Sequence, residues 1–285
     1  MFFGSKKNEE AAGPVGPGQF GHFFLQEKIN SGGMADIWLA TDREQRTCAV
    51  RRLHDSLRSD RTARKRFLQG CEVLSQIHDH ECVIGYFEHG KIDGALYLSM
   101  EYVEGENLKL MYGAHDPVLL ENVGNIIIDM ATGLEHVHES GFMHLDFKPE
   151  NVLVTRNASV RLVDFDLSLP IPKSPRKLDK NPGTPAYMAP EQLQREPVDQ
   201  RADIFAFGVS TYELLTNYKP FPGEKPSEIL ASQLDRASFI LPRQHNPDIP
   251  QSLENLIVKC LQPNPDNRYL LMTMLMHDLK SALYV

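Results

Sequence analysis

The residues that decide the fold form the run His144-Leu145-Asp146-Phe147-Lys148-Pro149-Glu150-Asn151, which is followed by Asp164-Phe165-Asp166 and Gly183-Thr184-Pro185-Ala186-Tyr187-Met188-Ala189-Pro190-Glu191. Transfer of a phosphoryl group from ATP needs a carboxylate at the incoming hydroxyl and metal ligands at the phosphates. Asp146 matches the carboxylate, and Lys148 supplies a cation for the charge of the moving group. Asn151 and Asp164 match the metal ligands. The order and spacing of these motifs together indicate phosphoryl-transfer chemistry.

On either side of these motifs the pattern of the chain differs. Before residue 105, runs typical of strands alternate with Gly or charged turns, and one stripe is helical; the strand runs cover 23–29, 35–41, 47–53, 83–89 and 95–102, and the helix 60–77. After it, helical stripes dominate, over 118–140, 201–216, 227–234, 252–260 and 270–283, with short strands at 152–155 and 160–163 and an exposed loop at 169–185. We therefore expect an α+β fold of two lobes with a cleft between them.

The expected domain limits follow from this change of pattern. Residues 1–19 are rich in Gly and Pro and should form a disordered tail, because Gly13 to Gly18 cannot hold a helix or a strand. An N-lobe with a small, five-stranded antiparallel sheet should cover 20–104. A mostly helical C-lobe should cover 105–285.

Composition excludes several classes of protein. The 285 residues carry a formal net charge of −8, which argues against binding to nucleic acid or to an anionic membrane surface. Neither a signal peptide nor a membrane-spanning stretch is expected, since no apolar run is long enough. The four cysteines form no C-x-x-C pair and indicate free thiols in a reducing compartment, so we expect a cytoplasmic protein.

With these motifs, the chain from about residue 20 to residue 285 resembles the eukaryotic-type (Hanks-type) Ser/Thr protein kinases, and its Gly32 to Ala40 segment is most similar to the bacterial members. The resemblance implies a bilobal kinase fold, ATP with Mg²⁺ or Mn²⁺ as the ligand, a protein substrate or partner, and a role in signalling. It implies catalytic roles for Asp146 and Lys148. The implied ATP-binding residues are Ile29, Gly32, Gly33, Ile37, Ala49, Arg51, Glu101, Val103 and Leu153, and the implied metal ligands are Asn151, Asp164 and Asp166.

The resemblance also assigns structural positions. His144, Phe165, Leu74 and Tyr86 match an apolar regulatory stack, and Met100 lies at the gatekeeper position before the hinge 101–103. Asp203 matches the buried aspartate that braces the catalytic loop, and Glu191 with Arg268 matches a buried ion pair. These residues imply that the fold is kept without showing that the protein turns over substrate.

Two departures change the central ion pair of the family. The lysine that grips ATP is replaced by Arg51, whose planar fork is larger than an ammonium and presents its donors differently. The helix glutamate that pairs with this lysine is replaced by Gly70, and Glu72 points about 200° away around the helix. Without that glutamate, Arg51 could reach phosphate or another carboxylate. Arg52 should point to the opposite face of its strand.

Further departures surround the same cleft. The Asp-Phe-Gly motif ends in Asp166, which could recruit a divalent cation or repel phosphates. The catalytic loop has Leu145 where the family has the arginine that holds a phosphorylated activation loop. In the glycine-rich loop, Asn30 and Ala35 replace two glycines, which is a mild change.

These changes predict a pseudokinase with impaired phosphoryl transfer that acts as a protein-binding or regulatory scaffold and can still bind nucleotide. The alternative is a weakly active or atypical Ser/Thr kinase that uses Asp146 as base, with Arg51 in place of the lysine. A third alternative is transfer of a nucleotidyl group. The sequence leaves open whether the chain is an enzyme.

Overall fold

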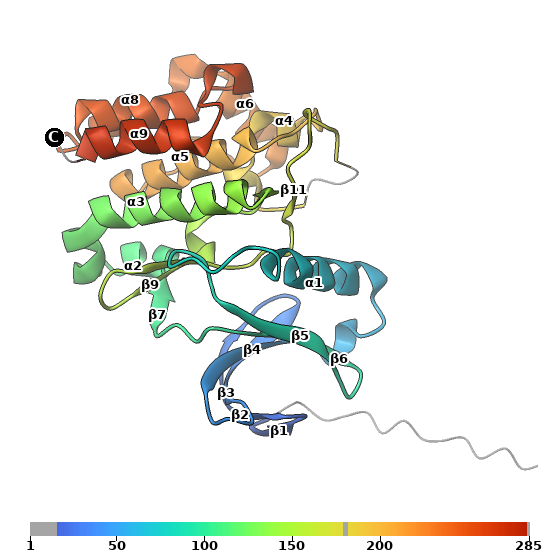
Figure 1. The fold of residues 1–285 in the computed structure, drawn as a ribbon. Helices are drawn as coiled ribbons and strands as arrows, with labels where there is room; N and C mark the ends of the chain where they lie inside the picture. The colour runs from blue at the N-terminus through green and yellow to red at the C-terminus, as the bar shows by residue number, and fades with distance from the viewer. Residues whose placement is uncertain (1–15, 179–181, 284–285) are drawn as a thin grey trace, which may run out of the picture.

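The computed structural model describes residues 16–178 and 182–283, which form the two expected lobes, one mainly of strands and one mainly of helices (Figure 1). Residues 1–15 of the expected tail lie outside the described residues. Among the described residues no helix is both long enough and apolar enough to cross a bilayer.

The N-lobe is an antiparallel sheet with the order β1-β2-β3-β4-β6-β5. Its strands are β1 (Gly18–Phe20), β2 (Phe23–Ser31), β3 (Ala35–Thr41), β4 (Thr47–Leu53), β5 (Tyr86–Ile92) and β6 (Ala95–Met100). The helix α1 (Arg61–Leu74) lies between the sheet and the C-lobe, as Figure 1 shows. Asp60 caps α1 by accepting from the amides of Thr62 and Ala63, and Phe67 and Cys71 are fully buried on its inner side.

The sheet has six strands where five were expected, because β1 had been placed in the tail. Gly18 and Gln19 pair with β2, and Gly21 (φ +58°) makes the turn between the two strands. The ring of Phe20, which is buried, packs edge-on against Tyr97 at 5.9 Å between centroids. The prediction that no strand forms up to Gly18 was therefore wrong at its end, since pairing and the burial of one aromatic ring outweigh the cost of ordering glycine.

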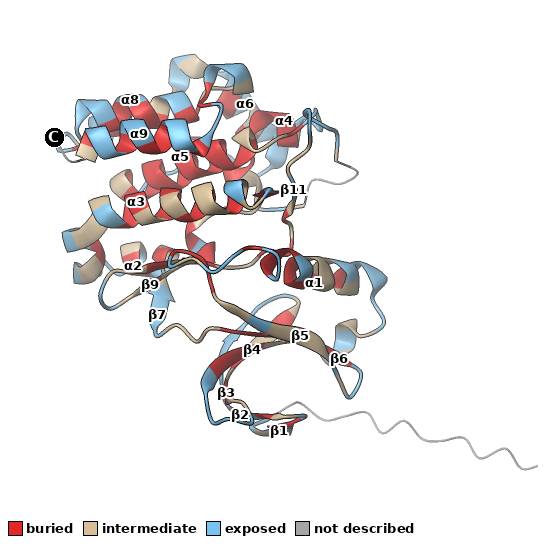
Figure 2. Cartoon of the chain, viewed as in Figure 1, coloured by how far each residue is buried: buried red, intermediate tan, exposed pale blue. Residues whose placement is uncertain are grey.

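The C-lobe packs its helices around α5. The helices are α2 (Leu108–Gly113), α3 (Pro117–Glu139), α4 (Pro190–Leu193), α5 (Arg201–Thr216), α6 (Pro226–Leu234), α7 (Pro242–His245), α8 (Gln251–Cys260) and α9 (Met272–Leu283). Figure 2 shows α5 buried along most of its length, whereas α9 exposes one side. One apolar cluster runs from α1 and the inner face of the N-lobe sheet through the C-lobe helices, so the two lobes share a core.

The C-lobe also contains short strands, two of which contribute residues to the cleft between the lobes. They are β7 (Gly105–Asn107), β8 (Phe142–Met143), β9 (Val152–Thr155), β10 (Val160–Leu162) and β11 (Leu169–Pro170). In the sheet β10-β9-β7, the strand β7, which follows the hinge, pairs with β9. The strand β9 also pairs with β10, which follows it after a turn. The segment expected to be a loop from Leu169 therefore begins with β11, which pairs with β8.

Candidate active site

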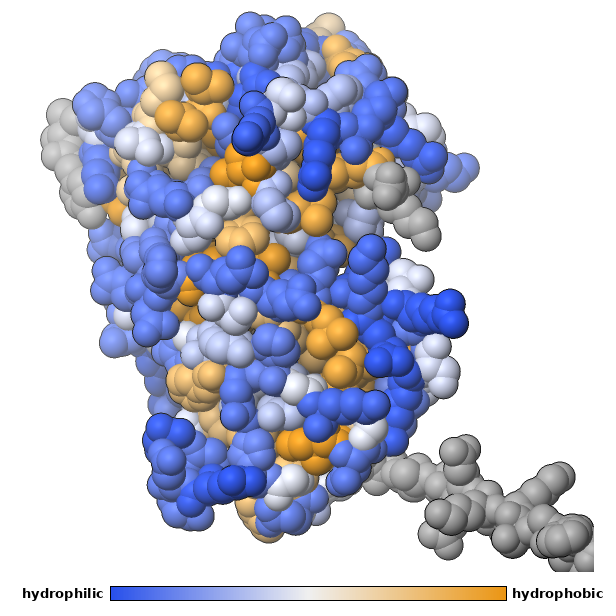
Figure 3. Space-filling view, turned by 45° about the vertical axis from the view of Figure 1, so that its right-hand side comes forward, coloured by the Kyte–Doolittle hydropathy of each residue, from blue (hydrophilic) through white to orange (hydrophobic). Residues whose placement is uncertain are grey.

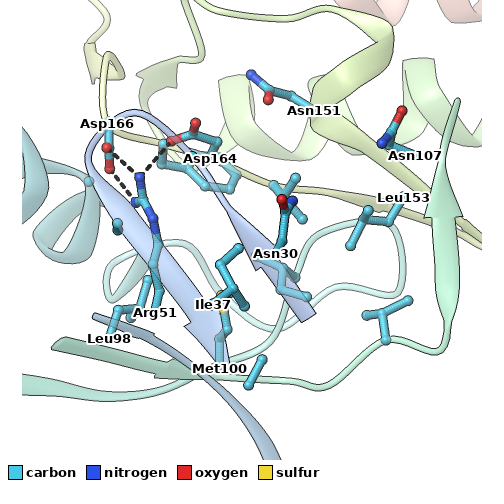
Figure 4. Close-up of a pocket in the computed structure, with 18 of the residues that line it drawn as sticks. Asn30, Ile37, Arg51, Leu98, Met100, Asn107, Asn151, Leu153, Asp164 and Asp166 are labelled. Carbon is cyan, nitrogen blue, oxygen red and sulfur yellow. Dashed lines mark hydrogen bonds and ion pairs between the residues drawn. The ribbon is translucent and has the colours of Figure 1, made fainter. Parts of the chain in front are cut away.

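A cavity of about 490 Å³ lies between the lobes, and all nine residues that were predicted to bind ATP line it. They come from β2 and the turn after it, from β3 and β4, from the hinge that follows β6, and from β9. The predicted metal ligands Asn151, Asp164 and Asp166 line the same cavity, and Figure 4 shows them at one end of it. The binding of nucleotide and metal remains a prediction.

The other end of the cavity is apolar. Ile37, Ala49 and Met100 lie on neighbouring strands of the N-lobe sheet, and Leu153 of β9 lies on the C-lobe side (Figure 4). In the hinge, the side-chain carboxylate of Glu101 accepts from Arg161 at 3.0 Å. The backbone amide of Glu101 donates to the carbonyl of Gly85 at 2.8 Å. A planar base could therefore meet Glu101 only through the backbone carbonyl.

The catalytic loop forms a closed network around Asp146. Lys148 Nζ donates to Asp146 Oδ2 at 2.8 Å and to Thr184 Oγ1 at 2.9 Å. The amide nitrogen of Asn151 donates to the carbonyl of Asp146 at 2.8 Å and to its carboxylate at 3.1 Å. The amide oxygen of Asn151 is thereby the atom left for a cation. These contacts hold Asp146 and Lys148 in the arrangement that a base and a neighbouring cation need.

Asp203 braces this loop from beneath, as the resemblance implied. Its buried carboxylate accepts from the amides of His144 at 2.8 Å and Leu145 at 2.7 Å, and from the ring of His138 at 2.9 Å. Burial by itself would raise the pKa of Asp203, but the bond from His138 and the charges of His138 and His144 lower it. The brace is needed because Leu145 adopts φ +61°, which is unfavourable for a branched side chain.

Arg51 and Asp166 form the central ion pair of the site. Arg51 Nη1 donates to Asp166 Oδ1 and Nη2 to Oδ2, both at 2.7 Å, so the guanidinium and the carboxylate meet through two parallel bonds (Figure 4). Arg51 Nη2 also lies 3.6 Å from Asp164 Oδ1. The ring of Phe67 lies beneath the guanidinium, 5.2 Å from its central carbon. Of the two partners expected for Arg51, phosphate or another carboxylate, the structure shows the carboxylate.

The pair is buried and charged. Burial by itself would lower the pKa of Arg51, but the charges of Asp166 and Asp164 raise it above its ordinary value. Burial raises the pKa of Asp166, and the contact with Arg51 works against that rise. Two parallel hydrogen bonds from a guanidinium that keeps its charge favour the carboxylate form of Asp166.

Gly70 makes room for this pair. A Cβ atom at Gly70 would lie 2.5 Å from Asp166 Oδ1, closer than a Cβ approaches another heavy atom, and 3.0 Å from Asp166 Cα, which is a tight contact. At Gly70 the helix lacks the carboxylate that the family carries there. The side chain of Asp166 lies against the helix at this position. Arg51, Gly70 and Asp166, which the sequence offered as three separate departures, form one structural unit.

This unit gives Asp166 a partner other than a metal ion. Both of its carboxylate oxygens accept from Arg51 and its side chain is 7% exposed, which argues against a role as metal ligand. Asp164 differs, because its side chain is 38% exposed and its buried Oδ1 accepts no hydrogen bond. An oxygen of this kind fits a divalent cation, which prefers carboxylate and amide oxygens, so Asp164 and Asn151 are the side chains that would hold one.

Other expected positions are found in place. Arg52 is buried on the opposite face from Arg51, where it bonds Asp55 at 2.7 Å. Glu191 and Arg268 form a buried pair at 2.7 Å. The rings of His144 and Phe165 lie 5.0 Å apart, and Leu74 and Tyr86 belong to the apolar core that the two lobes share, while contact along the whole stack remains a prediction.

The sequence did not reveal a second carboxylate network. Glu213 of α5 accepts from Lys109 at 2.7 Å, from the hydroxyl of Tyr112 at 2.8 Å and from the hydroxyl of Tyr187. It thereby joins α2 to the 3-10 helix Pro185–Tyr187 that follows Thr184. Burial would raise the pKa of Glu213, but these donors lower it. In the sequence, Glu213 is a carboxylate within the mostly apolar helical segment 201–216. That unusual position was the signal that could have indicated its role.

Comparison with known proteins agrees with this geometry. The protein kinase domain family matches residues 23–279. Serine/threonine-protein kinase PknB of Mycolicibacterium smegmatis is 31% identical over 253 residues, which cover 86% of this chain and 40% of that protein. Serine/threonine-protein kinase PrkC of Bacillus subtilis is 30% identical over 264 residues, which cover 92% of this chain and 40% of that protein.

The chain spans about two fifths of the length of these curated relatives. Within that span the match includes both lobes and the cleft between them. The ordered motifs, the two-lobed fold and the match over residues 23–279 show that the chain belongs to the protein kinase domain family and is related to bacterial serine/threonine kinases.

Proposed function

We propose that this chain is a pseudokinase, in which phosphoryl transfer is impaired and which acts by binding other proteins. The observation that carries the proposal is the bidentate pair of Arg51 with Asp166. In the family, a lysine on this strand reaches the phosphates while a glutamate on the helix orients it. Here the cation on this strand, Arg51, is instead held by Asp166, two residues after Asp164.

The physical consequence concerns the positioning of ATP. Both terminal nitrogens of Arg51 already donate to a buried carboxylate, so a phosphate must compete with Asp166 for them. Hydrogen bonds between charged groups are worth about 1.5–3 kcal/mol each, which is enough to misplace a phosphate. Correct orientation supplies several kcal/mol of the barrier reduction in reactions of this class. We infer that ATP with Mg²⁺ or Mn²⁺ still binds through the apolar end of the cavity and Asp164, but is held poorly for transfer.

A weakly active Ser/Thr kinase is the second candidate, and two observations favour it. The network of Asp146, Lys148, Asn151 and Thr184 is complete. Arg51 and Asp166 also leave the formal charge of this part of the site unchanged. One cation and one carboxylate replace the family's Lys and Glu, which are likewise one cation and one carboxylate. In this case Asp146 would act as base and Arg51 would grip the phosphates.

Mass spectrometry after incubation with ATP and Mg²⁺ or Mn²⁺ separates the candidates. We expect the wild-type chain to modify itself or a mixed peptide substrate no faster than the Asp146→Asn variant. We expect the triple variant Arg51→Lys/Gly70→Glu/Asp166→Gly, which restores the family's residues, to exceed it by about 100-fold. A wild-type rate well above that of Asp146→Asn would establish the second candidate, and addition of AMP in place of phosphate would indicate nucleotidyl transfer.

Nucleotide binding is tested separately by thermal unfolding with ATP, with and without each metal ion. A ligand that binds only the folded state stabilises it by mass action, so even weak binding raises the midpoint temperature. We expect a rise that Asp164→Asn reduces in the presence of metal. A cytoplasmic location and a protein partner remain predictions of the sequence.

A further inference from the structure

A second hollow, with a volume of about 610 Å³, lies between α1 and the segment that follows Asp166. Five basic residues line it, and we call it the basic groove: Arg61, Lys65 and Arg66 come from α1, and Arg176 and Lys177 from the opposite wall. Figure 3 turns this side of the molecule forward and shows mainly hydrophilic side chains there, with hydrophobic patches between them. The groove concentrates positive charge on a chain whose net charge is −8.

Within residues 16–178 and 182–283, the structure shows no ion pair for any of the five cations of the basic groove. Asp166 is the carboxylate among the described lining residues, and Arg51 already holds it. Arg61 and Lys65 are four residues apart on one helix face, where like charges repel each other. An anion bound between the walls would therefore relieve an unfavourable arrangement.

The walls of the groove are fixed before any ligand arrives. Gln69 of α1 donates to the carbonyl of Ser168 at 2.7 Å and so joins α1 to the segment that carries Leu167 and Leu169. Arg176 exchanges two backbone hydrogen bonds with Val198, at 3.1 and 2.8 Å, which hold its segment against the C-lobe. A site whose walls are already in place binds its ligand at a lower entropic cost.

Apolar side chains also line the groove, and we call them its floor. They are the four leucines Leu145, Leu167, Leu169 and Leu178. Leu145 occupies the position at which the family has an arginine that holds the kinase's own phosphorylated activation loop. Basic walls over an apolar floor fit a peptide that carries a strong anion beside an apolar side chain.

We propose that the basic groove binds a phosphorylated segment of a partner protein. The phosphate would lie between α1 and Arg176, and an apolar neighbour in the segment would lie on the leucine floor. Arginine forks match phosphate oxygens in a bidentate manner, and three of the five basic residues are arginines. The negative net charge of the chain disfavours a nucleic acid in this place. The inference rests on the proposed function in that the chain acts by binding another protein.

The test uses the full 285-residue chain, immobilised, and three peptide libraries that differ at one fixed position. That position is phosphoserine, serine or aspartate, and the flanking positions are random. We expect the wild type to retain the phosphoserine library at least about tenfold more strongly than the serine library. The variant Arg61→Glu/Arg176→Glu, with one change on each wall, should lose this preference. The matched control Lys91→Glu/Lys280→Glu, with the same change in net charge on exposed residues elsewhere, should keep it.

Equal retention of the phosphoserine and serine libraries by the wild type would overturn the proposal, whatever the variants do. Equal retention of the aspartate library would overturn phosphate as the ligand. A single-stranded oligonucleotide that displaces the phosphoserine library completely at equal concentration would reassign the groove to nucleic acid. The assay contains no ATP, so its result is independent of the phosphotransfer measurement, and either proposal can fail while the other stands.

Discussion

The catalytic loop and the corner around Arg51 line one cleft, yet they carry their charges in different ways. In the loop, Asp146 and Lys148 keep the partners that their motif implies, and Asp203 holds the backbone from beneath. At the corner, the carboxylate has moved from the helix to the segment after Asp164, and Gly70 leaves the space that it needs. A buried ion pair can therefore take its carboxylate from a different segment of the chain when a glycine on the helix leaves the space for it.

The largest effect is expected where the loop is braced. The substitution Asp203→Ala removes the acceptor for two buried amides and for His138, and should lower the free energy of unfolding by about 3–5 kcal/mol. Chemical denaturation measures this loss. The exposed Asp248→Ala should change stability by less than about 0.5 kcal/mol. A loss below about 1 kcal/mol for Asp203→Ala would show that the catalytic loop keeps its conformation without Asp203.

The next effect tests whether the corner is one unit. The substitution Gly70→Glu forces a side chain against Asp166 and should cost about 1–3 kcal/mol of unfolding free energy. Adding Asp166→Gly should restore about 1–2 kcal/mol of that loss, because space is freed and the new carboxylate can reach Arg51. The matched control is Gly113→Glu, in a helix position with no atom within 4 Å, whose effect should simply add to that of Asp166→Gly. Additive effects at Gly70 as well would argue against a unit.

A smaller effect tests the fork of Arg51. The substitution Arg51→Lys keeps the charge but loses one of two parallel bonds, so denaturation should show a loss of about 1–2 kcal/mol. In an Asp166→Gly background the same substitution should have little effect. Equal losses in both backgrounds would mean that Arg51 is held by Asp164 or by Phe67 rather than by Asp166.

The smallest effect concerns acid. The pKa of Glu213 is lowered in the folded chain from an ordinary value of 4.5, so its charged form stabilises the fold above that pH. This contribution is lost as the pH falls through the lower, folded pKa. Unfolding midpoints measured between pH 6 and pH 3 should therefore fall less steeply in Glu213→Gln than in the wild type. Parallel curves would show that Lys109, Tyr112 and Tyr187 bind the neutral group equally well.

Much of the fold was predictable because its signals are local. The strands at 35–41 and 47–53 and the helix at 201–216 were placed at their observed limits, since alternation, periodicity and turn residues act over a few positions. The strand β1 and the helix α2 were missed, because each is short and depends on burial against distant residues. All nine predicted ATP-binding residues line one cavity, since the fold brings together the strands and turns that carry their motifs.

Motifs and periodicities that act within short spans of the sequence predict the family, the two lobes and the residues around the cleft. The sequence also showed that Arg51, Gly70 and Asp166 depart from the family. That the three residues form one unit is visible only in the folded chain, since Arg51 and Asp166 lie 115 residues apart and meet beside the space left by Gly70. The partner of a buried charge depends on the space around it, and that space exists only once the chain has folded.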